Sequence, residues 1–381
     1  MAGQAPGSSG LEPASQRSTR KREHPPSTNA QVIADSCRRT SRVEVVELEF
    51  TLRLRGTRER ALSRSQSTVM VTGGAGFVGV TAVRRIAATG RHVAVVDKRS
   101  DGAERLSGVV GRDRIDSTDL TDGGATRACF LRWKPDVVVH LAAIHFIPYC
   151  NANPAETILT NAYATQNVLD ACVAAGCNRV ILASTADVYA VSDEPHRETD
   201  PVEPSNIYGL TKRLSEDVCR LWRSGEPGQR RLDILRLFNV IGPGETNPHL
   251  LPDIIAGAKR GALTLGNVDT RRDFVGVEEV ADVIARLVDR ADATELTMNV
   301  GTGRTTDARE LVAIVNEFLA SNLEIGVDPS RLRVSDRPVL CADTSLLDEQ
   351  FPERHRSDLA SAVLSTLRAD GDVLLRSSLP Q

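Results

Sequence analysis

Two residues with complementary chemistry, Tyr208 and Lys212, stand four positions apart in the stretch IYGLTK. The surrounding segment, residues 206–222, has helical periodicity, so both side chains should lie on one helix face, one turn apart. A phenol with an ordinary pKa of about 10 is a poor base at neutral pH, and a neighbouring ammonium group lowers that pKa. The pair therefore predicts a site that removes a proton from a substrate hydroxyl group.

The stretch STADVY, residues 184–189, adds a hydroxyl group and a carboxylate about twenty residues before Tyr208. Thr185 supplies the hydroxyl group and Asp187 the carboxylate, whereas Ala186 between them has no group that can transfer a proton. The Asp187 carboxylate can act as a catalytic base, or it can hydrogen-bond backbone groups at a strand end. We favour the structural role for Asp187.

A glycine-rich stretch, TGGAGFVG at residues 72–79, precedes these residues and follows an apolar run. Glycines at 73, 76 and 79 allow a tight turn, a close approach of backbone to a pyrophosphate, and packing of the next helix on the strand. Asp97 follows Gly79 at the spacing of a carboxylate that binds an adenosine ribose. A carboxylate repels a 2'-phosphate, so the pattern favours NAD over NADP, although Lys98 and Arg99 could hold such a phosphate.

Short apolar runs alternate with helical segments from residue 68 onward, which predicts an α/β fold, a doubly wound parallel (Rossmann) sheet with helices on both faces. We expect strands at 68–72, 92–97, 136–142, 179–185 and 232–240. We expect helices at 77–90, 123–133, 155–176 and 206–222. The hydride chemistry of a nicotinamide and the proton chemistry of Tyr208 would then meet at the carboxyl ends of these strands.

Composition divides the chain into four predicted parts. Residues 1–66 carry twelve Lys and Arg against seven Asp and Glu and are rich in Gly, Ser and Pro, which predicts a disordered basic extension; within it, only residues 43–55 alternate like a strand. Residues 67–240 should form the dinucleotide-binding domain. Residues 241–353, which begin rich in Gly and Pro, should form a smaller interleaved substrate-binding lobe, and residues 354–381 a tail.

Charge and cysteine usage narrow the possible partners and location. A net charge of -3 gives no reason to expect nucleic acid or a membrane surface as a partner, and no apolar run approaches the length of a membrane helix. The seven cysteines form no Cys-x-x-Cys pair and no metal-ligand spacing, so we expect reduced thiols, no metal site and a cytoplasmic protein. His145 and Cys150 lie in the loop 144–154, near the expected site, but single residues of these types usually pack or hydrogen-bond.

From residue 68 to 343 the sequence resembles the extended short-chain dehydrogenase/reductase family, in its nucleotide-sugar epimerase/dehydratase branch. The resemblance includes TGGAGFVG, STDL, HLAA, TNAYATQNVLDA, STADVY, YGLTK and RLFNVIGPGE, in this order. It implies a UDP-glucose 4-epimerase-like enzyme with NAD as cofactor and a homodimer formed through helices 154–176 and 207–223. The cofactor contacts that it implies are Gly73, Gly76, Phe77, Val78, Gly79, Asp97, Asp119, Leu120, Leu141, Ala142, Ala143, Asn161, Ser184, Tyr208 and Lys212.

The resemblance also implies roles on the substrate side. Thr185 would hydrogen-bond the reacting hydroxyl group, Tyr208 would be the base, and Lys212 would also hold the nicotinamide ribose. The nucleotide-sugar contacts that it implies are Thr185, Asn239, Arg272, Arg333 and Asp336. Arginine suits the diphosphate because its planar group binds phosphate oxygens in pairs.

The resemblance leaves three chemistries open after a first oxidation at C4 of the sugar. An epimerase returns the hydride to the other face of the ketone, whereas a dehydratase needs an acidic pair directly after the Thr, and decarboxylating relatives have Ser then Glu there. Ala186 removes the acid of such a pair. We therefore expect 4-epimerisation of a UDP-hexose, with a dehydratase or decarboxylase that uses Asp187 as base as the alternative, and a non-catalytic NAD-sensing regulator as a third.

Overall fold

The computed structural model describes residues 67–99, 101–291, 294–329 and 337–371. The chain divides into two units, residues 1–61 and 62–381, and every described residue lies in the second. The predicted basic extension, residues 1–66, and the predicted strand at 43–55 therefore lie outside the described residues.

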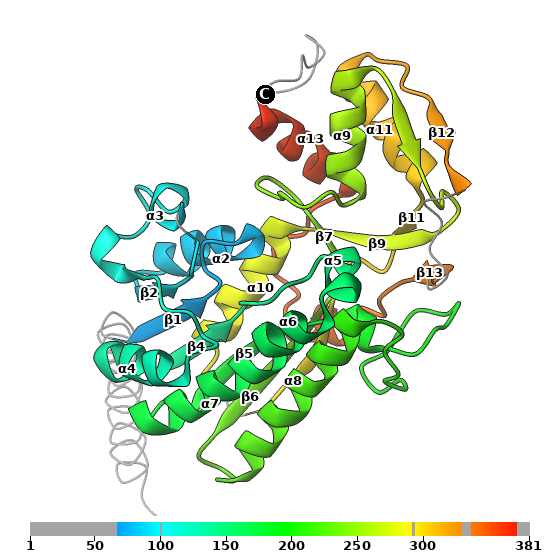
Figure 1. Cartoon of the computed structure of the whole chain (residues 1–381). Coiled ribbons are helices and arrows are strands. Elements are labelled where there is room, and N and C mark those ends of the chain that lie inside the picture. The colour runs from blue at the N-terminus through cyan, green and yellow to red at the C-terminus, as the bar shows by residue number, and fades with distance from the viewer. Residues whose placement is uncertain (1–66, 100, 292–293, 330–336, 372–381) are drawn as a thin grey trace, which may run out of the picture. The chain divides into compact units, whose positions relative to one another are not determined.

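The largest sheet has seven strands, and all neighbouring strands in it are parallel (Figure 1). Its spatial order is β10-β6-β5-β4-β1-β2-β3, so the chain begins in the middle, builds one edge and then crosses to build the other. This order is that of a doubly wound dinucleotide-binding sheet, which confirms the predicted fold class. Its strands are β1 (Thr68–Thr72), β2 (His92–Val96), β3 (Ile115–Asp116), β4 (Val137–His140), β5 (Arg179–Thr185), β6 (Arg231–Leu237) and β10 (Thr297–Val300).

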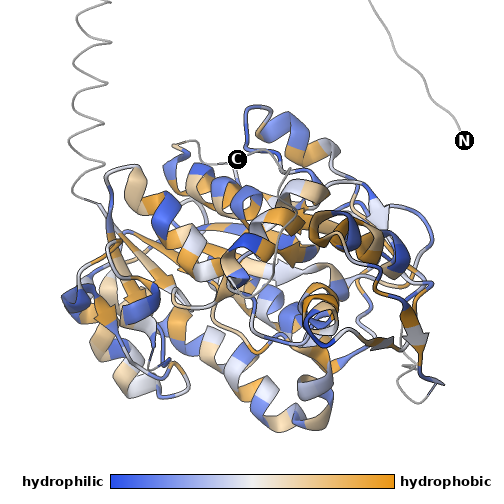
Figure 2. Cartoon of the chain, turned by 90° about the horizontal axis from the view of Figure 1, so that it is seen from above, coloured by the Kyte–Doolittle hydropathy of each residue, from blue (hydrophilic) through white to orange (hydrophobic). Residues whose placement is uncertain are grey.

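Helices cover both faces of this sheet because its strand residues are apolar on both sides. Val69 and Val71 belong to a core that α2 and α10 complete, whereas Met70 belongs to a core shared with α4, α7 and α8. In Figure 2 the strands are mostly in the hydrophobic colour, whereas the helices carry both the hydrophobic and the hydrophilic colour. The helices are α2 (Phe77–Ala88), α4 (Gly123–Trp133), α7 (Ala164–Ala175), α8 (Ile207–Ser224) and α10 (Val277–Asp289).

All five predicted strands form, and the structure differs from the prediction in one strand and one helix. The run predicted at 232–240 divides, because β6 ends at Leu237 and β7 (Asn239–Ile241) pairs with β9 in another sheet. The helix predicted at 155–176 is interrupted by a π-helical turn, η2 (Leu159–Tyr163), between α6 (Pro154–Ile158) and α7. The two-residue strand β3 and the edge strand β10 were not predicted, since both are too short to show a periodic pattern.

A second group of elements builds the smaller lobe around β9. Its strands are β7, β8 (Leu263–Leu265), β9 (Arg271–Gly276), β11 (Thr305–Thr306), β12 (Ile325–Val327) and β13 (Val339–Leu340). Its helices are α9 (Leu250–Arg260), α11 (Ala308–Leu319) and α13 (Leu359–Asp370), which share one apolar core. Val363 and Leu367 of α13 are buried in that core, so this helix packs on the lobe. A surface helix was expected in this last part of the chain, and its assignment to a separate tail, residues 354–381, stays a proposal.

The remaining short helices connect these layers. They are α3 (Gly102–Arg105), η1 (Arg112–Arg114), α5 (Ile147–Ala152), η3 (Ala186–Val188) and α12 (Ser345–Gln350). The predicted boundary between residues 240 and 241 falls inside β7, and β10 returns from the smaller lobe to the edge of the large sheet. The division into two interleaved domains stays a proposal.

The structure shows the state of the described cysteines and the length and polarity of the described helices. Six cysteines of the described residues are free and buried, namely Cys129, Cys150, Cys172, Cys177, Cys219 and Cys341. Within the described ranges, none of the helices is both long enough and apolar enough to cross a membrane.

The turn from β1 into α2 tolerates no side chain at Gly79. A Cβ atom there would fall 2.1 Å from the carbonyl oxygen of Gly73. We expect Gly79→Ala to lower the free energy of unfolding by roughly 1–3 kcal/mol, the usual cost of overpacking, as measured by urea denaturation. Gly124→Ala is the matched control, because its Cβ would meet only ordinary contacts in α4. Equal stability of the two variants would contradict the close packing of this turn.

Candidate functional site

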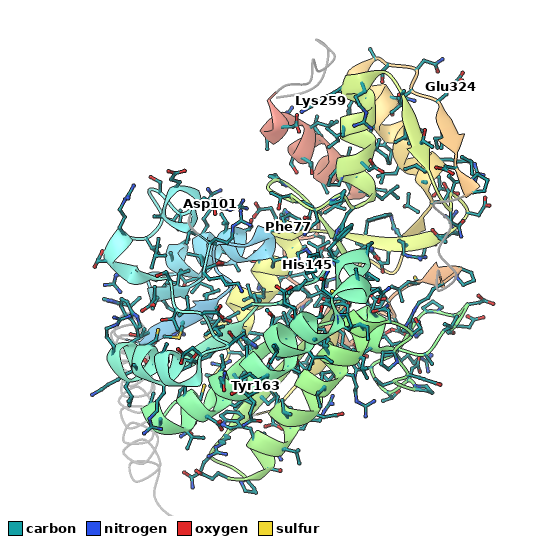
Figure 3. All side chains as sticks on the ribbon, viewed as in Figure 1. Phe77, Asp101, His145, Tyr163, Lys259 and Glu324 are labelled. Atoms are coloured by element: carbon teal, nitrogen blue, oxygen red, sulfur yellow. The ribbon has the colours of Figure 1, made fainter. Side chains whose placement is uncertain are left out.

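A cavity of about 690 Å³ lies at the carboxyl edge of the large sheet. Loops after β1, β2, β4 and β5 line it together with β7, β9 and the loop before α9. Phe77 and His145, two of the lining residues, are labelled near the centre of Figure 3. The predicted site residues that line it are Gly73, Gly76, Phe77, Val78, Gly79, Asp97, Asp119, Leu120, Leu141, Ala142, Ala143, Ser184, Thr185, Asp187, Tyr208, Lys212, Asn239 and Arg272.

The glycine-rich turn between β1 and α2 lies close to the residues that follow β4. Gly73 has a φ of +68°, and a Cβ atom on it would fall 2.7 Å from the backbone nitrogen of Ala142. The Asp97 carboxylate accepts a hydrogen bond from Ala75 N at 2.9 Å and one from Arg99 N at 3.0 Å. The turn and the carboxylate are thus fixed to each other before any ligand binds.

The cations beside Asp97 have carboxylate partners of their own. Lys98 Nζ lies 3.6 Å from Asp119 Oδ2. The Arg99 guanidinium donates two hydrogen bonds to Asp101, each of 2.9 Å. These pairs compete with a 2'-phosphate for the two cations, which agrees with the sequence-based preference for NAD over NADP.

Asn161 does not line the cavity but lies fully buried behind its wall. Its Oδ1 atom accepts a hydrogen bond of 2.7 Å from Ile144 N, and its Nδ2 donates one of 2.9 Å to Ile144 O. A further bond of 3.0 Å to Thr211 Oγ1 ties this loop to α8. The geometry supports a role in positioning the loop after β4, and the predicted cofactor contact remains a prediction.

Thr185 and Asp187 face each other where β5 ends. Thr185 Oγ1 accepts a hydrogen bond of 3.2 Å from Asp187 N and lies 3.4 Å from Asp187 Oδ2, to which it donates. Asn206 Nδ2 donates to Asp187 Oδ1 at 3.2 Å, while Asn206 Oδ1 caps α8 by accepting from Gly209 N at 2.8 Å. The Asp187 carboxylate therefore bonds side chains, not the backbone groups that we expected, and it remains on the cavity wall.

Burial sets the protonation of Tyr208 and Lys212. Burial and the negative charge of Asp187 raise the pKa of Tyr208 well above its ordinary value, although a hydrogen bond with Thr185 acts the other way. Burial lowers the pKa of Lys212 to about 8, against the effects of Cys219 and Glu216. In the protein alone the Tyr208 pKa thus moves opposite to the predicted direction, because loss of hydration and the negative charge of Asp187 both disfavour the phenolate.

A buried ion pair holds the helix that carries both residues. The Arg236 guanidinium on β6 donates two hydrogen bonds, of 3.0 and 2.9 Å, to Glu216, one turn after Lys212. Their side chains are only 3% and 0% exposed. Ser184 Oγ of β5 donates to the same carboxylate at 2.5 Å. Three elements, β5, β6 and α8, are therefore joined at one carboxylate below the cavity.

The cavity is also lined by an arginine, Arg337, that sequence analysis missed. Arg337 Nη2 donates to the backbone oxygen of Asp187 at 3.1 Å, so this segment reaches across to the end of β5. Its position beside the predicted Asp336 was the only available signal. Arg272 lies on β9 and donates to the Arg337 backbone oxygen at 2.8 Å. The predicted contacts Arg333 and Asp336 lie outside the described residues.

Comparison with known proteins adds a family assignment to this geometry. Residues 69–301 match the model of the NAD dependent epimerase/dehydratase family. A UDP-glucose 4-epimerase from Thermus thermophilus, solved in complex with NAD, superposes with a TM-score of 0.71 at 25% identity. That match covers 81% of this chain and 100% of the other.

Two relatives similar in sequence have different names. One is the GDP-6-deoxy-D-talose 4-dehydrogenase of Aggregatibacter actinomycetemcomitans, 27% identical over 78% of this chain and 96% of its own length. The other is UDP-glucose 4-epimerase 2 of Oryza sativa subsp. japonica, which is 29% identical over 72% of this chain and 74% of its own length. The relatives thus share nucleotide-sugar names but differ in the reaction named.

The low pKa of Lys212 predicts a pH-dependent stability. Between its folded pKa of about 8 and its ordinary value of 10.5, the unfolded chain binds the extra proton, so stability should rise with pH through this window. The stability of the wild type relative to Lys212→Met should therefore increase by up to about 3 kcal/mol from pH 8 to 10.5. Urea denaturation across this range measures the difference, with exposed Lys98→Met as control. A constant difference would contradict the burial effect.

Proposed function

Because this chain belongs to the NAD-dependent epimerase/dehydratase family, we propose that it is an NAD-dependent nucleotide-sugar epimerase that inverts C4 of a UDP-hexose. The observation that carries the proposal is the meeting of Thr185, Tyr208 and Lys212 with the glycine-rich turn and Asp97 in one cavity. The name of the Oryza sativa relative and of the Thermus thermophilus structure supports it.

The cofactor would lie between the β1–α2 turn and the end of β5. The close approach of Gly73 to Ala142 leaves backbone, not side chain, to face a pyrophosphate, and the α2 N-terminus favours its charge. Asp97 would accept from the adenosine ribose, and Lys212 would donate to the nicotinamide ribose. When bound, NAD supplies a hydride acceptor that can return the hydride to the opposite face of a ketone.

The proton of the sugar hydroxyl group would pass to Tyr208. The free protein keeps this phenol protonated, because burial and Asp187 raise its pKa. Removal of a substrate proton would thus require the pKa of Tyr208 to fall when cofactor and substrate bind. The Lys212 ammonium, one helical turn away, would then help to stabilise the phenolate. Thr185 would hydrogen-bond the reacting hydroxyl group and orient it towards Tyr208.

The residue directly after Thr185 favours epimerisation over loss of water or carbon dioxide. Ala186 is buried and has no acidic group, so the position next to the threonine offers no acid to protonate a leaving hydroxyl group at C6. Asp187 already accepts from Thr185 and Asn206. On the far side of the cavity, Arg272 would bind the substrate diphosphate together with Asn239, and Arg333 and Asp336 are proposed for its nucleotide end.

The proposal predicts a product of unchanged mass. Purified protein would be incubated with UDP-, dTDP- and GDP-hexoses, and products would be analysed by mass spectrometry and by chromatography of the released sugars. We expect interconversion of C4 epimers without added reductant. Tyr208→Phe should lower turnover by about 10²–10⁴-fold, the usual contribution of an acid–base residue, while the fold stays intact. Tyr149→Phe, which removes an exposed phenol outside the cavity, is the matched control.

Other products would identify other members of the same family. A 4-dehydrogenase is the second candidate, because the Aggregatibacter actinomycetemcomitans relative carries that name. In that case NADH would accumulate with product, whereas an epimerase regenerates NAD in each cycle. Loss of water or carbon dioxide would instead assign a lyase with Asp187 as base. Absence of any turnover with all sugars, with NAD still bound, would favour a sensor.

We further propose that two copies of the chain associate through α6–η2–α7 and α8. Exposed apolar side chains occur on these neighbouring segments, and one of them, Tyr163, is labelled in Figure 3. Leu210, Leu214 and Leu221 are 49%, 45% and 71% exposed on α8. Such a patch commonly marks a protein interface. The remaining members are Ile158, Leu159, Tyr163 and Val173.

A charge placed in this patch should separate the subunits. We expect wild-type protein to elute as a dimer in size-exclusion chromatography with light scattering, and Leu214→Glu to elute as a monomer, because a carboxylate would be buried at the interface. Val327→Glu changes an exposed apolar residue on β12, away from the patch, and should remain dimeric. A monomeric wild type would refute the interface.

A further inference from the structure

Three metal-ligand side chains meet at the cavity although they are distant in sequence. His145 follows β4, whereas Glu245 and His249 belong to the segment between β7 and α9. Their ligand atoms all lie within 4.8 Å of one another. Glu245 Oε2 is 3.8 Å from His145 Nε2 and 3.6 Å from His249 Nδ1. All three line the cavity, and the reaction proposed above uses none of them.

The carboxylate at the centre of this cluster is held in place. The Glu245 side chain is only 5% exposed, and it accepts a hydrogen bond of 2.8 Å from Asn247 N through Oε1. Its second oxygen is therefore the one directed to both imidazoles. The His145 and His249 side chains are 39% and 36% exposed, so an ion can reach the cluster from the cavity.

The donor set selects a class of ion. Imidazole nitrogens with one carboxylate oxygen suit zinc and the neighbouring transition metals, whereas calcium and magnesium prefer oxygen alone. Around zinc, ligand bonds of about 2.0–2.2 Å bring ligand atoms to within roughly 3.3 Å of each other, so these three groups need to move inward by only a fraction of an ångström. Two histidines and one glutamate leave one tetrahedral position for an oxygen ligand.

Ring packing restricts both histidines of the cluster, and one hydrogen bond competes with metal binding. Asn247 Nδ2 lies 3.0 Å from His145 Nε2, and metal binding would replace this hydrogen bond. The His249 ring packs 5.5 Å from the ring of Phe146 and, edge on, 5.5 Å from that of His145. These contacts restrict both imidazoles, which lowers the conformational cost of binding an ion.

We propose that His145, Glu245 and His249 bind one divalent transition-metal ion of the zinc class and direct its fourth position into the cavity. The ion joins the loop after β4 to the segment before α9 across the sugar side of the cavity. Its open position takes water or a substrate oxygen. The sugar side and the substrate oxygen rest on the proposed function, but the three ligand residues take no part in the proposed epimerase reaction, and the test of metal binding needs no turnover.

The test uses the full-length, untagged protein, stripped with a chelator and then equilibrated with Zn²⁺ or Co²⁺. We expect about one Zn²⁺ per chain by plasma mass spectrometry after removal of free ion. Bound Co²⁺ should show visible absorption without the charge-transfer band of a thiolate ligand, because the cluster formed by the described residues contains no cysteine. Glu245→Gln and His249→Gln should each weaken Zn²⁺ binding by more than the roughly 10–100-fold cost of losing an outer-shell partner.

Controls separate this site from adventitious binding. His355→Gln removes an exposed histidine outside the cavity and should retain full metal content. Circular dichroism and the unfolding midpoint of the metal-free variants show whether they fold, and the increase in midpoint on adding Zn²⁺ should be lost in Glu245→Gln and kept in His355→Gln. A wild type without stoichiometric metal, or variants of Glu245 and His249 that bind as tightly as wild type, would overturn the proposal.

Discussion

The Glu216–Arg236 ion pair is the interaction on which the candidate site depends. Charges this far from water are costly unless each is fully matched, and here two parallel hydrogen bonds and the Ser184 hydroxyl group satisfy the carboxylate. Because Glu216 lies on α8 and its partners on β5 and β6, the pair sets both the rotation and the height of that helix against the sheet. Tyr208 and Lys212 lie on the same helix, so the ion pair also determines where their side chains lie relative to the sheet.

Local sequence patterns predicted the parts of the molecule that short-range chemistry determines. The sequence alone predicted the helix that carries Tyr208 and Lys212, the glycine-rich first turn and the apolar strands. Each of these elements depends on the types of residues that lie close together in the chain. The split after Leu237 was not readable, since the apolar run continues without a break while the chain changes sheets. Whether an apolar residue joins one sheet or another depends on tertiary partners.

The site shows the same limit. Its cofactor side lies on consecutive strand ends and could be predicted from order in the chain. Contacts between distant segments, such as Arg337 with Asp187 or His145 with Glu245, have no local signal. The direction of the Tyr208 pKa shift was also predicted wrongly. The spacing in the sequence indicates that Lys212 is a neighbour, but it does not show how deeply Tyr208 is buried, and burial is the largest cause of the upward shift.

The change of sheets after β6 also constrains motion. Only Phe238 separates β6 from β7; it is 4% exposed, and its backbone nitrogen donates to Val300 O of β10 at 3.0 Å. Large rigid-body movements require residues that are free to change their φ and ψ angles. The connection consists of Phe238 alone, which is buried and hydrogen-bonded to β10. We therefore expect the large sheet and the sheet that contains β7 to move little relative to each other, so that a bulky ligand would enter and leave by displacement of the loops at the cavity rim.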